Sequence, residues 1–278
     1  MPHSPIPDPS PSSAAPFARS APAYPAVVAR LRAAGCVFAE DEADLLFSAA
    51  LGSADLDAKV GRRAAGVPLE HVVGWAAFAG LRVAVDPGVF VPRRRTEFLV
   101  ARAAALAPER PAVVDLCCGS GALGAALAAV RPGAELHAAD VDPAAVACAR
   151  RNVAAFGGTV YTGDLYDPLP RGLRGRVDVL MANVPYVPTG EIGLLPGEAR
   201  EHEARTALDG GPDGLATLRR VSAAAPVWLA PGGRLLFETS ERQAETAAAI
   251  AAGDGFWVQV EADEEIGATV VVATAPGA

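Results

Sequence analysis

The sequence predicts an α/β fold, in which a mostly parallel sheet follows a small helical domain and a β-hairpin. From residue 111 onward, short apolar runs alternate with helix-like stretches at intervals of about 20 residues, a pattern typical of strand–helix–strand units with right-handed crossovers. Before residue 111, the apolar residues follow first a helical and then an alternating, strand-like spacing. A chain of 278 residues is long enough for one α/β domain and a smaller one.

The N-terminal part is expected to consist of a tail and a helical domain. Residues 1–22 are rich in Pro and Ser and lack the basic start and apolar block of a secretory signal, so we expect a disordered tail. Residues 23–67 are expected to form a helical domain, because apolar side chains recur there at helical spacing, with breaks near Gly35 and Gly52.

A β-hairpin linker is expected over residues 68–92. Apolar residues within 72–78 and the alternation over 81–85 indicate two strands that turn at Ala79-Gly80. The sequence Asp-Pro-Gly at 86–88 is a turn signal and is expected to close the hairpin.

Residues 93–278 are expected to form a Rossmann-like domain. Its predicted parallel strands cover residues 112–116, 135–140, 159–164, 177–183 and 234–239. Helices are expected between them at 121–130 and 143–156, the second with Asp142-Pro143 as its cap and first turn. The last two apolar runs, 256–263 and 268–274, have no helix between them, so we expect an antiparallel pair at the edge of the sheet.

The charge is uneven along the chain and argues against a binder of long nucleic acids. Residues 1–110 carry 12 basic and 11 acidic side chains, a balance of +1, whereas residues 111–278 carry 12 basic and 21 acidic ones, a balance of −9. A protein that wraps a polynucleotide needs many Lys and Arg contacts to phosphates. Because residues 111–278 are strongly acidic, we do not expect the protein to bind nucleic acid directly.

The cysteines and the hydropathy indicate a cytoplasmic protein outside the membrane. None of the apolar runs approaches the ~18 residues needed to span a bilayer. The four cysteines show no C-x-x-C spacing, so we expect reduced thiols and no metal site. The oligomeric state stays open.

A glycine-rich loop after the first predicted strand indicates a nucleotide-like cofactor. Gly119, Gly121 and Gly124 match G-x-G-x-x-G, and Asp140 follows Gly121 by 19 residues, at the end of the next strand. Taken literally, this is the fingerprint of a dinucleotide site. Gly119 and Gly121 are expected to let the backbone approach the cofactor closely. The alternative is a tight strand-to-helix turn that binds nothing.

The acidic residues beside this loop favour S-adenosylmethionine over a nicotinamide cofactor. Asp115 directly precedes the loop, where its carboxylate would repel a diphosphate but suits a sulfonium and an ammonium group. Asp140 is expected to accept hydrogen bonds from the ribose, and Asp164, at the end of the third strand, from the adenine amino group. A turn-capping role is the alternative for Asp164.

The motif 183-NVPY-186 follows the fourth predicted strand and resembles the N-P-P-Y motif of class I methyltransferases that modify planar nitrogens. The resemblance implies that the Asn183 side-chain oxygen and the Val184 carbonyl accept the two N–H bonds of the target amino group. It also implies that Tyr186 packs on the flat face of the target. Pro185 stiffens the backbone between them and holds Val184 near the extended region. These four residues are the expected catalytic motif.

Several stretches together resemble the HemK/PrmC-type protein N(5)-glutamine methyltransferases, which modify the glutamine of the GGQ motif in peptide chain release factors. The stretches are 68–100, 115–124, 163–169, 183–186, 203–215 and 238–243. The resemblance implies S-adenosylmethionine as cofactor, a release factor as partner, and a helical domain, a hairpin and a Rossmann-like domain. Phe90 is expected in the acceptor pocket or, as an alternative, in the core.

Departures from the family pattern leave alternatives open. Val184 replaces a proline, 92-PRRRTE-97 replaces P-R-P-E-T-E, and Glu203-Ala204-Arg205 replaces E-P-R. A nucleic-acid amino methyltransferase acting on adenine N6 or guanine N2 is one alternative, since a flipped base fits the same slot. A catalytically silent module that binds S-adenosylmethionine is another. Arg93, Arg94 and Arg95 are expected in a solvated turn or, as alternatives, against an acidic partner or RNA.

Overall fold

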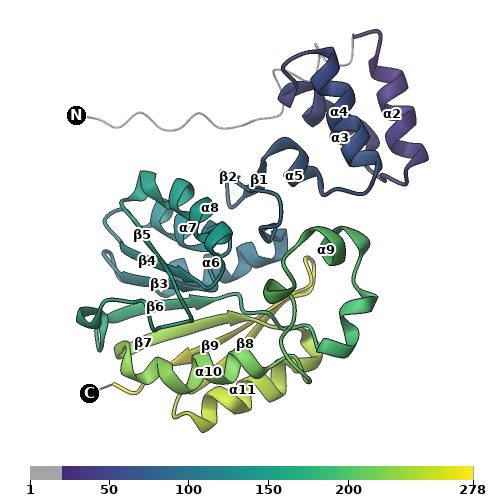
Figure 1. Cartoon of the computed structure of the whole chain (residues 1–278). Coiled ribbons are helices and arrows are strands. Elements are labelled where there is room, and N and C mark those ends of the chain that lie inside the picture. The colour runs from purple at the N-terminus through teal and green to yellow at the C-terminus, as the bar shows by residue number, and fades with distance from the viewer. Residues whose placement is uncertain (1–20, 278) are drawn as a thin grey trace, which may run out of the picture.

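The computed structural model describes residues 21–277, so most of the expected N-terminal tail, residues 1–20, lies outside the described residues. The N-terminal helices are α2 (Tyr24–Ala33), α3 (Ala39–Ala49), α4 (Ser53–Ala64) and α5 (Leu69–Val73). They bury a common apolar cluster that includes Leu31, Leu46 and Val60. This helical unit stands apart from the sheet, joined to it through α5 and the hairpin (Figure 1).

The hairpin consists of β1 (Trp75–Phe78) and β2 (Leu81–Ala84), paired in antiparallel register as expected. Ala79 and Gly80 have φ angles of 47° and 75°, which is the backbone of a tight turn that follows the twist of its strands. The expectation was wrong for residues 72 and 73, which belong to α5. Val72 is buried in the helical cluster, so its apolar character reflects helix packing.

The sheet contains the seven strands of the expected α/β domain, in the order β5-β4-β3-β6-β7-β9-β8. Five are parallel, and β9 pairs antiparallel with β7 and β8, as predicted for the last two runs. Their bounds are β3 (Ala112–Leu116), β4 (Glu135–Asp140), β5 (Thr159–Thr162), β6 (Val177–Ala182), β7 (Leu229–Glu238), β8 (Trp257–Asp263) and β9 (Ala268–Thr274). Only β7 begins well before its predicted start, because its first residues, Leu-Ala-Pro-Gly-Gly, look like a turn.

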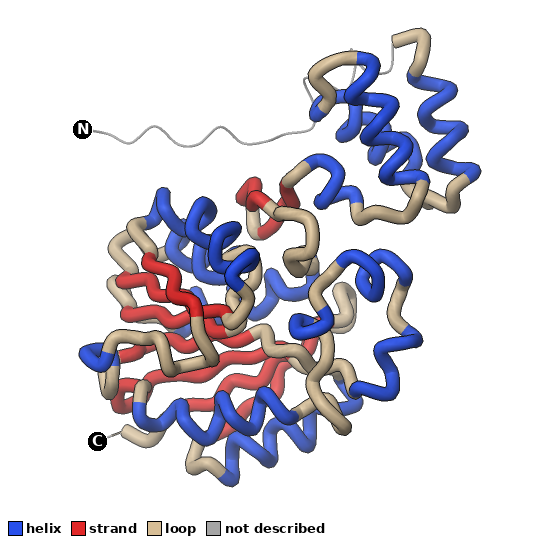
Figure 2. The backbone as a smooth tube through the Cα atoms, viewed as in Figure 1, coloured by secondary structure: helices blue, strands red, loops and turns tan. Residues whose placement is uncertain are grey.

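Helices cover both faces of the sheet, as Figures 1 and 2 show. On one face lie α6 (Glu97–Leu106), α7 (Ala122–Val130) and α8 (Pro143–Val153), and on the other α10 (Ala216–Ala224) and α11 (Ala244–Gly253). Each layer buries its own apolar cluster against the strands. Asp142 caps α8 as predicted, since its side chain accepts the Ala144 N–H at 2.8 Å.

The segment between β6 and α10 crosses back towards the hairpin instead of lying on the sheet (Figure 1). It carries α9 (Gly197–His202). The short 3-10 turns of the chain are η1 (Arg94–Thr96), η2 (Ala154–Phe156), η3 (Arg171–Leu173), η4 (Thr189–Leu194), η5 (Arg205–Ala207), η6 (Ala225–Val227) and η7 (Glu241–Gln243). Within residues 21–277, none of the helices has the length and apolar character needed to cross a bilayer.

Candidate active site

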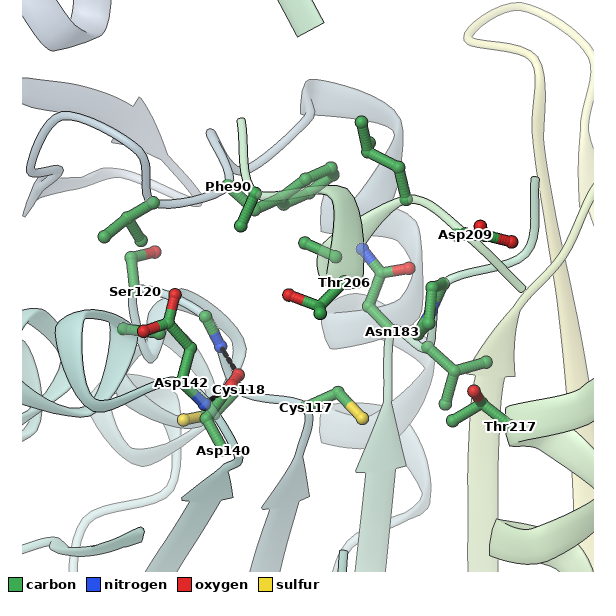
Figure 3. Close-up of a pocket in the computed structure, with 18 of the residues that line it drawn as sticks. Phe90, Cys117, Cys118, Ser120, Asp140, Asp142, Asn183, Thr206, Asp209 and Thr217 are labelled. Carbon is green, nitrogen blue, oxygen red and sulfur yellow. Dashed lines mark hydrogen bonds between the residues drawn. The ribbon is translucent and has the colours of Figure 1, made fainter. Parts of the chain in front are cut away.

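A cavity of about 920 Å³ lies at the carboxyl ends of β3, β4 and β6. The strand order reverses at β3, and ligands of open α/β sheets bind at such a switch point. The residues predicted from the sequence that line it are Phe90, Gly119, Asp140, Asp164, Asn183, Val184, Pro185 and Tyr186. Asp140 and Asn183 lie on opposite sides of the cavity, with Phe90 above and Cys117 below in the view of Figure 3.

Each of the three loop positions favours glycine for a different structural reason. Gly119 lines the cavity, and a Cβ there would meet only Phe90, at 3.9 Å. Gly121 does not line it: a Cβ there would lie 3.0 Å from the Ala149 Cβ, so this glycine allows α7 and α8 to pack closely. A Cβ at Gly124 would meet Leu136 at 2.9 Å, which places α7 against the sheet. Of the two glycines expected to contact the cofactor, Gly119 lines the cavity and Gly121 does not.

Asp115 is also absent from the lining of the cavity, contrary to the expected contact with the cofactor. Its side chain is 1% exposed, and one carboxylate oxygen accepts the N–H of Gly124 in the first turn of α7 at 2.9 Å. It thereby satisfies a backbone donor that a helix N-terminus leaves free. Burial raises the pKa of Asp115 to about 8. The carboxyl group supports the glycine loop from behind.

Cys117 occupies a strained position in the floor of the cavity. Its φ angle is 53°, in the left-handed region that costs most side chains roughly 1–2 kcal/mol. Glycine would adopt this angle at less cost. Burial raises the pKa of the thiol, so Cys117 remains protonated and acts as a small wall residue.

The end of the cavity near β4 and β5 combines carboxylates with apolar surface. The Asp140 carboxylate accepts the Gly119 N–H at 2.8 Å, which fixes the glycine loop against β4 (Figure 3). Each acid is followed by an apolar lining residue, Val141 after Asp140 and Leu165 after Asp164. Oxygen acceptors with apolar surface beside them suit a ligand that carries hydroxyl and amino groups on a flat ring.

Asp164 is already engaged in an ion pair with Arg220, whose Nη2 lies 2.5 Å from its carboxylate. The pair is about half exposed at the rim of the cavity, since the two side chains have exposed fractions of 49% and 58%. A carboxylate oxygen has more than one lone pair, so an additional amino group can be accommodated there.

At the opposite end, Asn183 directly follows the last residue of β6 and has a buried acceptor without a partner. No donor in the described part of the chain reaches its side-chain oxygen, although this atom is shielded from solvent. A buried polar atom of this kind costs free energy unless a ligand or water satisfies it. Asn183 lines the cavity, so its amide is a group at this end of the site that still has an acceptor to satisfy.

The rest of the NVPY segment is held in an extended path by the loop at 208–214. The Val187 N–H donates to the Leu208 carbonyl at 3.1 Å, and the Gly210 N–H to the Val187 carbonyl at 2.8 Å. The Val184 side chain is 2% exposed and packs into the apolar cluster beneath the sheet. Its backbone is therefore fixed without the proline of the related motif.

The Tyr186 side chain spans the wall of the cavity and is tied at its far end. Its hydroxyl donates to Glu238 at 3.0 Å and accepts from Arg95 at 2.6 Å. Burial raises the pKa of Tyr186 to about 12, so the phenol stays neutral. Its backbone carbonyl accepts from the Gln243 amide at 3.0 Å.

Phe90 forms part of the wall rather than part of the core. The Arg93 guanidinium lies over its ring, 4.8 Å from the centroid, and makes two bonds to the buried Glu203 carboxylate, at 2.6 and 2.7 Å. Arg93 and Arg95 thus face carboxylates within the chain itself. Arg94 and Arg95 are exposed in a turn as expected, but the pairing of Arg93 and Arg95 with carboxylates of the chain was not predicted.

Comparisons with known proteins identify the family. A family model described as Methyltransferase small domain matches residues 80–212. A release factor glutamine methyltransferase of Geobacter sulfurreducens is 41% identical over 199 residues, which cover 71% of this chain and 69% of that protein. The enzyme of the same name from Mycolicibacterium smegmatis is 38% identical over 263 residues, covering 88% and 92%.

The chain belongs to the release factor glutamine methyltransferase family. Its fold agrees with that of a methyltransferase from Pyrococcus furiosus, whose crystal structure aligns with a TM-score of 0.54 at 15% identity, over 81% of this chain and 100% of that one. The family and fold expected from the sequence are confirmed. Membership in this family makes S-adenosylmethionine the cofactor. The Asp140 and Asp164 end of the cavity offers carboxylate oxygens beside apolar surface, which suits a ligand of this kind.

Sequence reasoning missed the residues that support the motif from behind. Arg95 was expected in a turn, and Glu238 and Gln243 were given no individual functional role, since they appear only as the ends of the stretch 238–243. All three bind Tyr186. A signal for Gln243 and Gly210 existed, since both belong to stretches shared with the family, but spacing along the chain does not reveal what such residues contact.

Proposed function

We propose that this protein transfers a methyl group from S-adenosylmethionine to the side-chain amide nitrogen of a protein glutamine. The acceptor we propose is the glutamine of the GGQ motif of a peptide chain release factor. The observation that carries this proposal is the buried, unpartnered oxygen of Asn183 at the end of β6. The names of the two relatives support the same acceptor.

An amide nitrogen is a poor nucleophile because its lone pair is delocalised into the carbonyl. In the proposed arrangement, the Asn183 oxygen and the Val184 carbonyl accept the two N–H bonds of the glutamine amide. Two acceptors at fixed positions orient the nitrogen, and orientation of this kind contributes a large share of rate acceleration. Phe90 and Tyr186, which line the same cavity, supply flat surfaces for the amide.

When bound, S-adenosylmethionine would supply the methyl group as a sulfonium and would leave as a neutral thioether. The amide nitrogen would form the new N–C bond and lose one of its protons to water. The Asn183 oxygen already holds an N–H in this arrangement, so it stabilises the charge that develops on nitrogen. Preorganised groups of this type contribute roughly 100-fold or more when they act only on the developing charge.

The structure supports a protein acceptor over a polynucleotide. Arg93 and Arg95, two of three consecutive arginines near the cavity, are paired with Glu203 and Glu238. Their charges are therefore largely neutralised within the chain. A binder of nucleic acid needs such groups available for phosphates.

The proposal is tested by incubating the protein with tritiated S-adenosylmethionine and purified release factor. Label on the GGQ glutamine is expected, and Asn183→Ala should lower the rate by about 100-fold. Thr217→Ala, which changes another residue of the same cavity, is the matched control and should stay within about threefold. Absence of label on every release factor, or label on an oligonucleotide instead, would overturn the proposed acceptor.

A further inference from the structure

Three side chains from distant parts of the chain meet at the Tyr186 hydroxyl. Arg95 lies in η1, Tyr186 follows β6, and Glu238 ends β7. The Arg95 Nη2 donates to the Tyr186 oxygen at 2.6 Å, the Tyr186 hydroxyl donates to Glu238 Oε1 at 3.0 Å, and the Arg95 Nε donates to the same Oε1 at 3.0 Å. These bonds close a triangle in which each group has one fixed role.

The triangle allows only one orientation of the phenol. Glu238 is 2% exposed, so its carboxylate is shielded from water and needs donors from the protein. Arg95, with 44% of its side chain exposed, supplies one donor to the carboxylate and one to the phenol oxygen. The phenol must therefore direct its hydrogen to Glu238 and its lone pair to Arg95.

The other end of Tyr186 is held as well. The Gln243 side-chain amide donates to the Tyr186 carbonyl and to the Asp213 carbonyl, each at 3.0 Å. Its oxygen accepts from the Ser240 hydroxyl at 2.6 Å. The Gln243 amide therefore has both of its hydrogens and its oxygen engaged, and it links the Tyr186 backbone to that of Asp213.

We propose that Arg95 and Glu238 are positioning residues that hold the ring of Tyr186 in place against the acceptor amide. They act through Tyr186, and the inference rests on the proposed function of this site. In the related family segment, position 95 is a glutamate. Two carboxylates around one hydroxyl would repel each other, whereas a guanidinium at this position neutralises Glu238 and completes the triangle.

Kinetics of the variants separate this role from a general structural one. Arg95→Met should lower kcat about tenfold while KM for the release factor changes less than about threefold, because ring placement matters most in the transition state. In a Tyr186→Phe background, Arg95→Met should add less than about a twofold effect, since the hydroxyl it holds is gone. Arg95→Lys should restore part of kcat. Equal effects of Arg95→Met with and without the hydroxyl would overturn the proposal.

Arg94→Met is the matched control, because Arg94 is the exposed neighbour of Arg95 in the same turn. It should leave kcat and KM unchanged. A loss of kcat in Arg94→Met as large as in Arg95→Met would overturn the assignment, since it would show that the turn and not the triangle matters.

A measurement without substrate keeps this inference distinct from the proposed function. The chain has four tyrosines, and labelling the ring Cζ carbon with ¹³C gives one signal for each, of which Tyr186→Phe removes one. Arg95→Met and Glu238→Gln should each move that signal and leave the other three in place. An unmoved Tyr186 signal in an enzyme that methylates release factor would overturn the positioning role alone. A moved signal in a protein that methylates no release factor would overturn only the proposed acceptor.

Discussion

Replacing Gly210 by alanine tests whether the loop at 208–214 holds the NVPY backbone in its active position. A Cβ at position 210 would lie 2.6 Å from the Pro185 carbonyl oxygen and 2.5 Å from the Gly214 carbonyl oxygen. Gly210 does not have the positive φ angle that would strain any side chain. The effect of the substitution is therefore one of space alone.

The size of the effect follows from these distances. Close carbon–oxygen contacts in proteins are about 3.3 Å long, so the Pro185 carbonyl has to retreat by about 0.7 Å. Groups of an active site are held within about 0.5 Å of their productive geometry, and a misplacement of about 1 Å costs roughly 100-fold in rate. We therefore expect kcat of Gly210→Ala to fall between about 10-fold and 100-fold, and the free energy of unfolding by about 2 kcal/mol.

The assay is methyl incorporation into release factor, with urea unfolding measured on the same samples. Gly172→Ala is the matched control, because a Cβ there meets nothing within 4 Å and its φ angle is also not positive. Its stability should change by no more than about 0.5 kcal/mol and its activity not at all. If Gly210→Ala were as active as Gly172→Ala, the loop would not position the motif and the reasoning would be refuted.

Four further substitutions test other parts of the structure. The raised pKa of Asp115, about 8 against 3.8 in the unfolded chain, means that the folded state holds an extra proton between about pH 4 and pH 8, so the free energy of unfolding falls as pH rises through that window. Asp115→Asn removes this titration, and its stability relative to the wild type in urea should rise from pH 4 to 8; a constant difference would contradict the shift. Val184→Pro should keep methyl transfer within about threefold, since Val184 already supplies the needed backbone, and a gain of many orders of magnitude would show that this chain has another acceptor. Arg63, 10% exposed, is paired with Glu42 and Glu198; Arg63→Met should lower the free energy of unfolding by about 3 kcal/mol by leaving a shielded carboxylate unpaired. Replacing the exposed Glu198 by Gln should lower the free energy of unfolding by less than about 1 kcal/mol. If urea unfolding gave equal losses for Arg63→Met and Glu198→Gln, the shielded pair with Glu42 would not be the stabilising one.

The strands and helices of the sheet domain were predictable because their signals are local. Apolar runs such as 112–116 and 177–183 reveal buried strands by composition alone, and Asp142-Pro143 caps its helix through bonds two residues apart. The hairpin turn at Ala79-Gly80 is equally local. The strand prediction was wrong for residues 72–73, because two adjacent apolar residues fit a short helix as well as a strand.

The place of a residue in a motif does not show whether its side chain faces the cavity or the helix packed on the sheet. Asp115 and Asp140 both lie at or near the carboxyl end of a strand, yet Asp140 faces the cavity and Asp115 faces Gly124 of α7. Side chains alternate across a sheet, so one position along a strand reverses the direction of a side chain. Only the tertiary structure shows which carboxylate meets a ligand.

The sequence by itself determined the architecture and the family, because periodicity and motif spacing are properties of the chain. The packed structure decided how the motif is held. Arg95 lies 91 residues before Tyr186, and Glu238 lies 52 residues after it, so no local pattern connects them. Hydrogen bonds depend on the directions of donors and acceptors in space, and these directions exist only once the strands and loops have packed together.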